Sequence, residues 1–359
     1  MTQREQQILE LIAENPMISQ QELADKLGIT RSSVAVHISN LIKKGSIAGK
    51  GYVLRSGSYA VVVGGANVDI CGTSNAPLVG ADSNPGRVTT SLGGVGRNIA
   101  HNLSLLGADV RLLTAYGDDA QGQKLASSCA TLGIDLTHGL RVAGGTTSTY
   151  VYLTHPDGEM ALAVSDMEIC NKITPEYLAE KLSLLQNAKV VVADANIPAE
   201  SLQYLAENLT TPLFVDPVST AKAEKLRPIL SKIHTLKPNR LEAELLTGIP
   251  IHTEADEEKA AQKLLEMGVQ RLFMSLGSRG VYVAEEGKQF RMANLPGNMV
   301  NTTGCGDSFM AAIAWAWLEG MELEETALAG LATASFTMES QQTIHPGLCS
   351  EAVLARMER

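Results

Sequence analysis

The sequence predicts an α/β protein with a mostly parallel central sheet covered by helices on both faces, preceded by a small helical module. Runs of β-branched residues such as "YAVVV" (59–63), "KVVVADANI" (189–197) and "PLFVDPVS" (212–219) alternate with helical stretches, which is typical of a parallel sheet. Charge divides the chain as well. Residues 1–56 carry seven Lys/Arg against five Asp/Glu, a net of +2, so the rest of the chain carries −12.

Composition excludes several classes of protein. The 359 residues are 45% hydrophobic, and no apolar run reaches the eighteen or so residues of a membrane span or resembles a signal peptide. The five cysteines are odd in number and form no C-x-x-C pair, which argues against a disulfide framework and against a zinc site. We therefore expect a cytoplasmic protein with no membrane partner.

Residues 1–55 are predicted to form a separate module of three helices, followed by the linker "RSGS" (55–58). Ser19 and Glu22 have the spacing of a capping box, which places the start of the second helix. In the third helix Val34, Ile38 and Leu41 recur at helical spacing and predict its buried face.

This module, with "SIAGKGYVL" (46–54) as a wing, resembles the winged helix-turn-helix heads of bacterial regulators. The resemblance implies that the third helix enters the major groove of DNA, with base edges and phosphates contacted by Arg31, Ser32, Lys43, Lys44 and Lys50. A net charge of +2 gives only weak electrostatic attraction to DNA, so the alternative is a module that only mediates assembly. One small head has a small footprint, and useful DNA affinity would require a dimer.

The body of the chain offers candidate site residues where its predicted strands end. Ligands of parallel sheets bind beyond the carboxyl ends of the strands, and the polar residues found there are Asp69, Asn196, Asp216 and Asn239. The segment "TTSTYVYLTHPDGEMALAVS" (146–165) breaks the alternation. Its two alternating runs around a turn predict a hairpin that serves as a lid, an oligomer contact or a plain edge ornament.

Five short motifs follow one another along the body, after P-loop and G-x-G-x-x-G spacings have been excluded. They are "NVD" (67–69), "GGVGRN" (93–98), "NRLE" (239–242), "LGSRG" (276–280) and "TTGCGD" (302–307). In this order they resemble the ribokinase-like (pfkB) family of carbohydrate and nucleoside kinases, over about residues 58–350. The resemblance implies a three-layer ribokinase-like domain over 58–359 with a small β lid at about 71–92 and 140–165. It also implies that ATP and Mg²⁺ are needed for phosphoryl transfer.

The last motif combines an anion-binding loop with a candidate base. Gly304, Cys305 and Gly306 can present backbone N–H groups at the start of the helix "DSFMAAIAWAWLEG" (307–320), where the helix dipole favours negative charge. The resemblance implies that Asp307 is the catalytic base that takes the proton of the acceptor hydroxyl. The alternative is that Asp307 only caps the helix.

The resemblance assigns the remaining roles. For the substrate it implies Asn67, Asp69, Gly93, Gly94 and Asn98; for ATP it implies Asn239, Glu242, Ser275, Gly277 and Gly280. Glu242 would hold Mg²⁺ through water. A monovalent cation such as K⁺ would bind near Asn301 and Thr303. Because Asn301 is neutral where the family commonly has aspartate, we expect K⁺ to matter little.

Several segments, among them "ADSNPGRV" (81–88) and "HTLKPNRLEAELLTGI" (234–249), also resemble bacterial pseudouridine kinases. That resemblance implies phosphorylation of the 5′-hydroxyl of pseudouridine, with Asn196 and the lid residues Ser148 and Thr149 as plausible base contacts. The alternatives are a kinase for another nucleoside or sugar, of the inosine, uridine or ribose type, and a transcriptional regulator that uses the kinase fold as a ligand sensor. A homodimer, paired through the lid hairpin, is expected.

Overall fold

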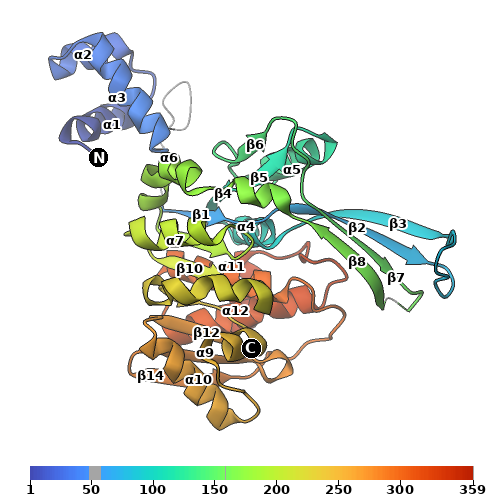
Figure 1. Cartoon of the computed structure of the whole chain (residues 1–359). Coiled ribbons are helices and arrows are strands. Elements are labelled where there is room, and N and C mark those ends of the chain that lie inside the picture. Colours follow the sequence, from blue (N-terminus) through green and yellow to red (C-terminus); the bar gives the residue numbers. More distant parts are fainter. Residues whose placement is uncertain (48–57, 158, 359) are drawn as a thin grey trace.

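The computed structural model describes residues 1–47, 58–157 and 159–358. Within these ranges the chain forms a head of three helices and an α/β body, from which a small β-sheet projects (Figure 1). The body has the ribokinase-like architecture that the sequence predicts. No helix in the described ranges is long and apolar enough to cross a membrane.

The head is a compact three-helix unit. Its helices are α1 (Gln3–Glu14), α2 (Gln20–Leu27) and α3 (Arg31–Lys43). The predicted capping box is present, since the Ser19 side chain accepts from the Glu22 backbone and the Glu22 side chain accepts from the Ser19 backbone. The three apolar positions that α3 was expected to bury lie in the head's own core. Most of the expected wing, 46–54, lies outside the described residues.

Eight strands form the central sheet in the order β14-β13-β12-β11-β10-β9-β1-β4. Their bounds are β1 Tyr59–Val63, β4 Asp109–Leu113, β9 Val190–Asp194, β10 Leu213–Asp216, β11 Thr235–Leu236, β12 Arg271–Ser275, β13 Val281–Glu285 and β14 Lys288–Met292. Every neighbouring pair from β4 to β12 is parallel, whereas β12–β13 and β13–β14 are antiparallel. The carboxyl ends of the parallel strands therefore meet at one edge.

Helices cover both faces of this sheet and make a three-layer body. Alternate residues of β1 enter two separate apolar cores, Val61 and Val63 on one face, Ala60 and Val62 on the other. The first face is covered by η1 (Glu168–Lys172), α6 (Pro175–Gln186), α7 (Ala199–Asn208), α8 (Thr220–Ala223), η2 (Glu224–Lys232), α9 (Arg240–Thr247) and α10 (Glu254–Glu266). The second is covered by α4 (Val95–Leu105), α5 (Ala120–Thr131), α11 (Cys305–Glu319), α12 (Leu323–Met338) and α13 (Ser350–Met357).

The projecting sheet, here called the lid, has the strand order β3-β2-β7-β8 (Figure 1). Its strands are β2 (Asn67–Ser74), β3 (Gly86–Gly93), β7 (Thr149–Thr154) and β8 (Met160–Asp166). The expected hairpin is present as the antiparallel β7–β8 pair. Asn67 and Asp69 were expected to end the first strand, but that strand stops at Val63 and they begin lid strand β2. β6 (Leu140–Val142) pairs with β5 (Ala115–Gly117) and not with the lid.

The two faces of the lid differ in character. Strand register brings Val88, Leu153 and Leu162 into one row across the sheet, flanked by Val151 and Val164. These five apolar side chains, here called the outer face, are 40–69% exposed. Because successive side chains alternate across a strand, the opposite or inner face carries the other set, which is Asp69, Cys71, Tyr150 and Tyr152.

Candidate active site

Three neighbouring parallel strands bring charged side chains to one edge of the sheet. Asp194 ends β9 and Asp216 ends β10, and the two residues are partners in the parallel register. Lys237 follows β11 and is 5% exposed. Asn239 forms an isolated parallel bridge with Ser275 at the end of β12. The carboxyl edge predicted from the sequence therefore brings together charged side chains that are buried.

Asp194 organises the turn that leaves β1. It is 0% exposed, and its carboxylate accepts hydrogen bonds from the backbone N–H groups of Gly65 (2.9 Å) and Asn196 (2.8 Å). Burial raises the pKa of Asp194 to about 6, although these two N–H donors lower it. The Asn196 side chain accepts from the Lys222 ammonium, so this expected base contact is already engaged with a lysine.

The residues expected to hold the acceptor lie together at the junction of body and lid. The Asn67 amide donates to Asp69 (2.6 Å), and Asn67 is paired with Gly93 across β2 and β3. A Cβ on Gly93 would collide with the Asp69 carboxylate, and one on Gly94, whose φ is 94°, would lie 2.5 Å from the Gly65 carbonyl oxygen. Burial raises the pKa of Asp69. The glycine pair therefore lets the chain at Asp69 and at Gly65 pack closely against the start of α4.

Thr149 does not join this group. Its partner in β2 is Val68, whereas Asp69 is the partner of Tyr150, so alternation puts Thr149 on the face opposite Asp69. The Thr149 hydroxyl donates to the Thr147 carbonyl (3.1 Å). Ser148 is also unsuited to contact a substrate, because it is 1% exposed and lies against the Cys170 thiol.

The anion loop is built at the start of α11. Gly304 has φ 85°, and a Cβ there would collide with the Thr343 carbonyl oxygen, so a glycine is required. No side chain caps the helix, and in the described ranges the N–H groups of Gly306 and Asp307 have no recorded acceptor. The Cys305 N–H was expected to face the anion, but it donates to the Thr302 carbonyl (3.2 Å).

Asp307 lies beside these N–H groups and is hydrogen-bonded to Asn98, a residue of the motif at 93–98. Its carboxylate accepts a hydrogen bond from the Asn98 amide of α4 (2.8 Å). Burial, with a smaller contribution from the charge of Asp216, raises the pKa of Asp307 to about 7, against the lowering effects of Asn98 and Lys237. The side chain is half-buried, so it is enclosed by protein and still reachable. A carboxylate with this pKa accepts a proton readily at neutral pH.

Asn239 and Glu242 form a capping box at the start of α9. The Asn239 side chain accepts from the Glu242 N–H (2.9 Å), and the Glu242 carboxylate accepts from the Asn239 N–H (2.8 Å). Glu242 is 3% exposed, and burial raises its pKa. Both residues expected near ATP are therefore fixed in position by each other.

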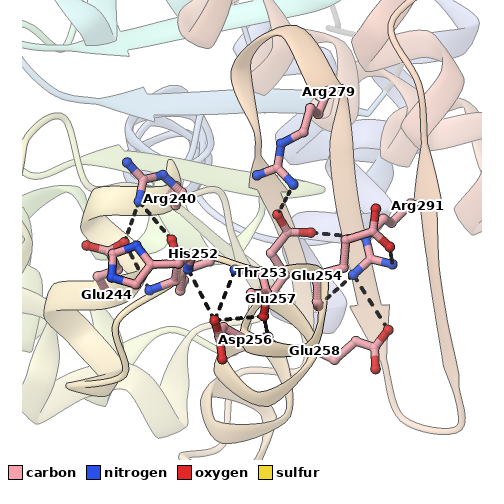
Figure 2. A network of polar contacts seen from close by, with 11 residues as sticks. Arg240, Glu244, His252, Thr253, Glu254, Asp256, Glu257, Glu258, Arg279 and Arg291 are labelled. Atoms are coloured by element: carbon pink, nitrogen blue, oxygen red, sulfur yellow. Dashed lines mark hydrogen bonds and ion pairs between the residues drawn. The ribbon is translucent and has the colours of Figure 1, made fainter.

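The expected nucleotide loop, Gly277 to Gly280, contains the short helix η3 (Gly277–Arg279). Figure 2 shows how it is anchored: the Arg279 guanidinium forms an ion pair with Glu257 of α10 (2.5 Å). The other Glu257 oxygen accepts from Arg291 of β14 (3.0 Å). Glu257 itself is 0% exposed. One buried carboxylate thus connects the loop, a helix and the edge strand.

Glu242 offers a chemically suitable contact for Mg²⁺. One oxygen of its carboxylate accepts from Asn239, and carboxylate oxygens are the ligands that Mg²⁺ prefers. The described residues contain no group of three His, Cys, Asp or Glu side chains arranged to enclose a metal ion. Near the expected K⁺ position, the Asn301 side chain accepts from the Thr303 N–H (2.9 Å).

Lys237 was missed by the sequence analysis. Its ammonium lies 3.1 Å from the Asp216 carboxylate, and both side chains are 7% exposed. A lysine in "TLKPN" has no periodicity that marks it as buried. The signal that could have found it is its place, directly after a short buried strand and beside a strand that ends in aspartate.

In the head, Arg31, Ser32 and Lys43 are exposed on α3. The Lys44 ammonium forms an ion pair with Glu5 (2.8 Å), whose side chain is 2% exposed, so Lys44 helps to hold the head together and is not free for a phosphate. Lys50 lies outside the described residues.

The fold and the charged edge together define a ribokinase-like kinase, and comparison with known proteins agrees. The model of the pfkB family carbohydrate kinases matches residues 58–348, and that of the winged helix-turn-helix DNA-binding domains matches residues 1–47. The chain belongs to the pfkB family and is a phosphotransferase of that family, with an N-terminal winged helix-turn-helix.

Individual relatives differ in how much of the chain they cover. The uncharacterized sugar kinase YeiI of Escherichia coli (strain K12) is 40% identical over 359 residues, covering 99% of each chain. The pseudouridine kinase of the same organism is 42% identical over 307 residues, which is 85% of this chain and 98% of the relative. The structure of Arabidopsis thaliana ribokinase complexed with ribose and ATP superimposes with a TM-score of 0.76 at 26% identity, over 85% of this chain and all of that one.

Proposed function

We propose that this protein transfers the γ-phosphoryl group of ATP to the 5′-hydroxyl of a nucleoside, with pseudouridine as the preferred acceptor. The observation that carries the proposal is the hydrogen bond between Asn98 and Asp307 (2.8 Å). It joins α4, which begins directly after Gly93 and Gly94, to the N–H groups at the start of α11. An acceptor hydroxyl, a base and an anion site therefore have places beside one another.

The reaction follows from these positions. Asn67 and Asp69 hydrogen-bond the sugar hydroxyls and orient the acceptor. The Asp307 carboxylate takes the proton of the 5′-hydroxyl as its oxygen attacks the γ-phosphorus, a new O–P bond forms, and the bond from phosphorus to the β-phosphate oxygen breaks to release ADP. The N–H groups of Gly306 and Asp307 stabilise the charge that builds on the phosphoryl oxygens.

Mg²⁺, held near Glu242 through water, would neutralise charge on the ATP phosphates when bound. Asn239 and Glu242 fix the start of α9 for this role, because each side chain caps the other's backbone N–H. Gly277 and Gly280, anchored through Arg279, provide the adjoining loop for the nucleotide.

The inner face of the lid favours a nucleoside over a simple sugar. Tyr150 and Tyr152 have ring centroids 5.5 Å apart, and Tyr150 is the strand partner of Asp69. Aromatic rings beside a sugar-binding carboxylate give a nucleobase a surface on which to stack. The similarity to a pseudouridine kinase supports pseudouridine as the particular nucleoside.

The test is turnover with ATP and a panel of pseudouridine, uridine, inosine, adenosine, ribose and fructose. We expect the highest kcat/KM with pseudouridine. A tenfold advantage for uridine or a hexose would overturn the substrate assignment and leave the kinase intact. No turnover with any acceptor would favour a sensor that retains only the kinase fold.

We further propose that the head binds DNA as part of a homodimer. Arg31, Ser32 and Lys43 form an exposed set on α3, and a second copy of the chain could cover the outer face of the lid, burying its apolar side chains. Light scattering should give a dimer for the wild type, and Leu162→Glu should shift it toward monomer.

A mobility shift on the gene's own upstream region should weaken steeply with salt and disappear when 1–55 are deleted. With no shift on that probe or on genomic fragments, the head would be an assembly module.

A further inference from the structure

Lys237 is a buried cation whose surroundings keep it charged. It follows β11 and is 5% exposed, and its backbone N–H donates to Val215. Burial by itself lowers the pKa of a lysine, but the charges of Asp216, Glu242 and Asp307 raise the pKa of Lys237 above its ordinary value. The side chain is therefore an ammonium ion at any pH at which the protein works.

The ammonium points toward the anion loop. A Cβ built on Gly306 would lie 3.4 Å from the Lys237 nitrogen, so the charge sits directly against the second glycine of the loop. An ammonium has three N–H groups, and within the described ranges Asp216 is its recorded side-chain acceptor. Donors remain on the side that faces the start of α11.

The start of α11 contributes nothing favourable to the charge of Lys237. The first turn of a helix carries partial positive charge, and cations are stabilised at the opposite end. Here the ammonium and the N–H groups of Gly306 and Asp307 converge from two directions, and the helix has no side-chain cap. Positive charge gathered in this way is suited to an anion that arrives from outside.

We propose that Lys237 is a catalytic residue of the phosphoryl transfer. Its ammonium donates a hydrogen bond to an oxygen of the γ-phosphoryl group as negative charge builds there, while Asp216 holds the side chain in place. Lys237 gives up no proton in the step: the hydroxyl proton goes to Asp307, and the bond that breaks is the one from phosphorus to ADP. This inference rests on the kinase function proposed above.

The alternative is that Lys237 only neutralises Asp216, and one pair of variants separates the two. Lys237→Met removes the charge and leaves the Asp216 carboxylate buried without a partner, which destabilises the fold in either case. The double variant Asp216→Asn/Lys237→Met removes both charges. If the pair is structural, the double variant regains stability and activity together. If Lys237 acts on the phosphoryl group, it regains stability alone.

We therefore expect the double variant to melt within about 4 °C of the wild type and to have a kcat at least about 100-fold lower. The KM for the nucleoside should change less than about threefold. Lys232 is exposed and lies five residues before Lys237. Lys232→Met is therefore the matched control, and its melting temperature and kcat should equal those of the wild type.

A second measurement covers the case in which the double variant folds poorly. Isothermal titration calorimetry compares the binding of ADP, in the presence of nucleoside, with and without aluminium fluoride. In the wild type and in Lys237→Arg, which keeps the charge, aluminium fluoride should make the binding tighter. In Lys237→Met this difference should be lost. The inference is overturned if the double variant keeps kcat within tenfold of wild type, or if Lys237→Met keeps the preference for aluminium fluoride. Wild-type protein inactive on every acceptor would instead count against the proposed function.

Discussion

Two charge clusters of the body are each built on a buried ion, and only the first is balanced by groups of the protein itself. At α10, the single buried carboxylate of Glu257 contacts the guanidinium groups of both Arg279 and Arg291 (Figure 2). At the carboxyl edge of the sheet, the ammonium of Lys237 pairs with Asp216 (3.1 Å) and also feels the negative charges of Glu242 and Asp307.

The difference indicates what each cluster is for. Burying an ion is costly unless it is paired, and the Glu257 cluster meets that requirement with groups of the protein itself. The cluster at Lys237 has one ammonium near three carboxylates, and the pKa of one of them, Asp307, is raised to about 7. In the reaction that we propose, a divalent cation would bind beside the carboxylates and phosphoryl oxygens would bind beside the ammonium.

The largest expected effect concerns the unbalanced cluster. Asp307→Asn keeps the shape of the side chain and removes the base, so kcat should fall at least about 1,000-fold, which corresponds to ~4 kcal/mol. ATP affinity should change little. Glu319→Gln, at the exposed far end of α11, is the control. Steady-state kinetics that leave a tenth of the wild-type kcat would exclude Asp307 as the base.

Loss of the Glu257 carboxylate should reduce the stability of the fold. Glu257→Gln deprives Arg279 of its carboxylate and leaves Arg291 with the exposed Glu254 and Glu258, so it should lower the free energy of unfolding by about 2 kcal/mol. Because Arg279 belongs to the nucleotide loop, the KM for ATP should rise severalfold while that for the nucleoside stays. Glu258 is exposed and lies 3.5 Å from Arg291. The control variant Glu258→Gln should therefore change neither the free energy of unfolding nor the KM for ATP. Equal effects of the two variants in urea titrations would show that the network does not anchor the loop.

The lid allows a comparison of its two faces within one strand. Tyr150→Ala removes an aromatic surface beside Asp69, and loss of stacking on a base should raise the nucleoside KM roughly tenfold. Thr149→Ala alters the next residue, on the opposite face, and should stay within about twofold in the same assay. The reverse order would mean that the base lies on the Thr149 side of the lid.

Sequence patterns predicted the fold and most of the site because both depend on local signals. β-branched runs ended by polar residues indicated that Asp216 and Asn239 would share an edge, and they do. Other features depend on distant packing. Asn98 meets Asp307 across 209 positions of sequence, and only the family resemblance linked them in advance. Glu257 meets Arg291 across 34 positions, with no motif to signal it.

The errors have similar causes. A hairpin was correctly expected at 146–165, but which residues face the substrate depends on register, and a shift of one position turns Thr149 to the other side. Lys44 was counted as a phosphate contact because it follows a helix in a basic stretch. Its real partner, Glu5, lies 39 positions away, and charge composition gives no sign of that pairing.

Smaller effects should appear in the pH dependence of stability. Folding raises the pKa of Asp307 from 3.8 to about 7, so the protonated form is favoured in the native state. This contribution is fully present below pH 3.8 and is lost as the pH rises through about 7. Asp307→Asn removes the buried charge and should raise the melting temperature by about 2–4 °C at pH 8, with the difference vanishing near pH 4. Equal melting temperatures at pH 8 would mean that the carboxylate is better solvated than its burial indicates.

The smallest effect is expected from monovalent cations. The Asn301 side chain accepts from the Thr303 N–H and offers a cation a dipole and not a full charge. Replacing tetramethylammonium with K⁺ at constant ionic strength should change kcat less than about twofold, and Asn301→Asp should increase that response. A tenfold activation of the wild type would mean that backbone carbonyls suffice to bind the ion.

The central claim, phosphoryl transfer to the 5′-hydroxyl at the Asp307 edge, is tested most directly by identifying the product. Wild-type protein, pseudouridine, ATP and Mg²⁺ are incubated, and the nucleotide formed is examined by phosphorus–proton correlation NMR. We expect one product whose phosphorus couples to the two 5′-methylene protons, formed by Glu319→Gln and absent with Asp307→Asn. Phosphate on the 2′- or 3′-oxygen, or the same product from Asp307→Asn at an undiminished rate, would contradict it.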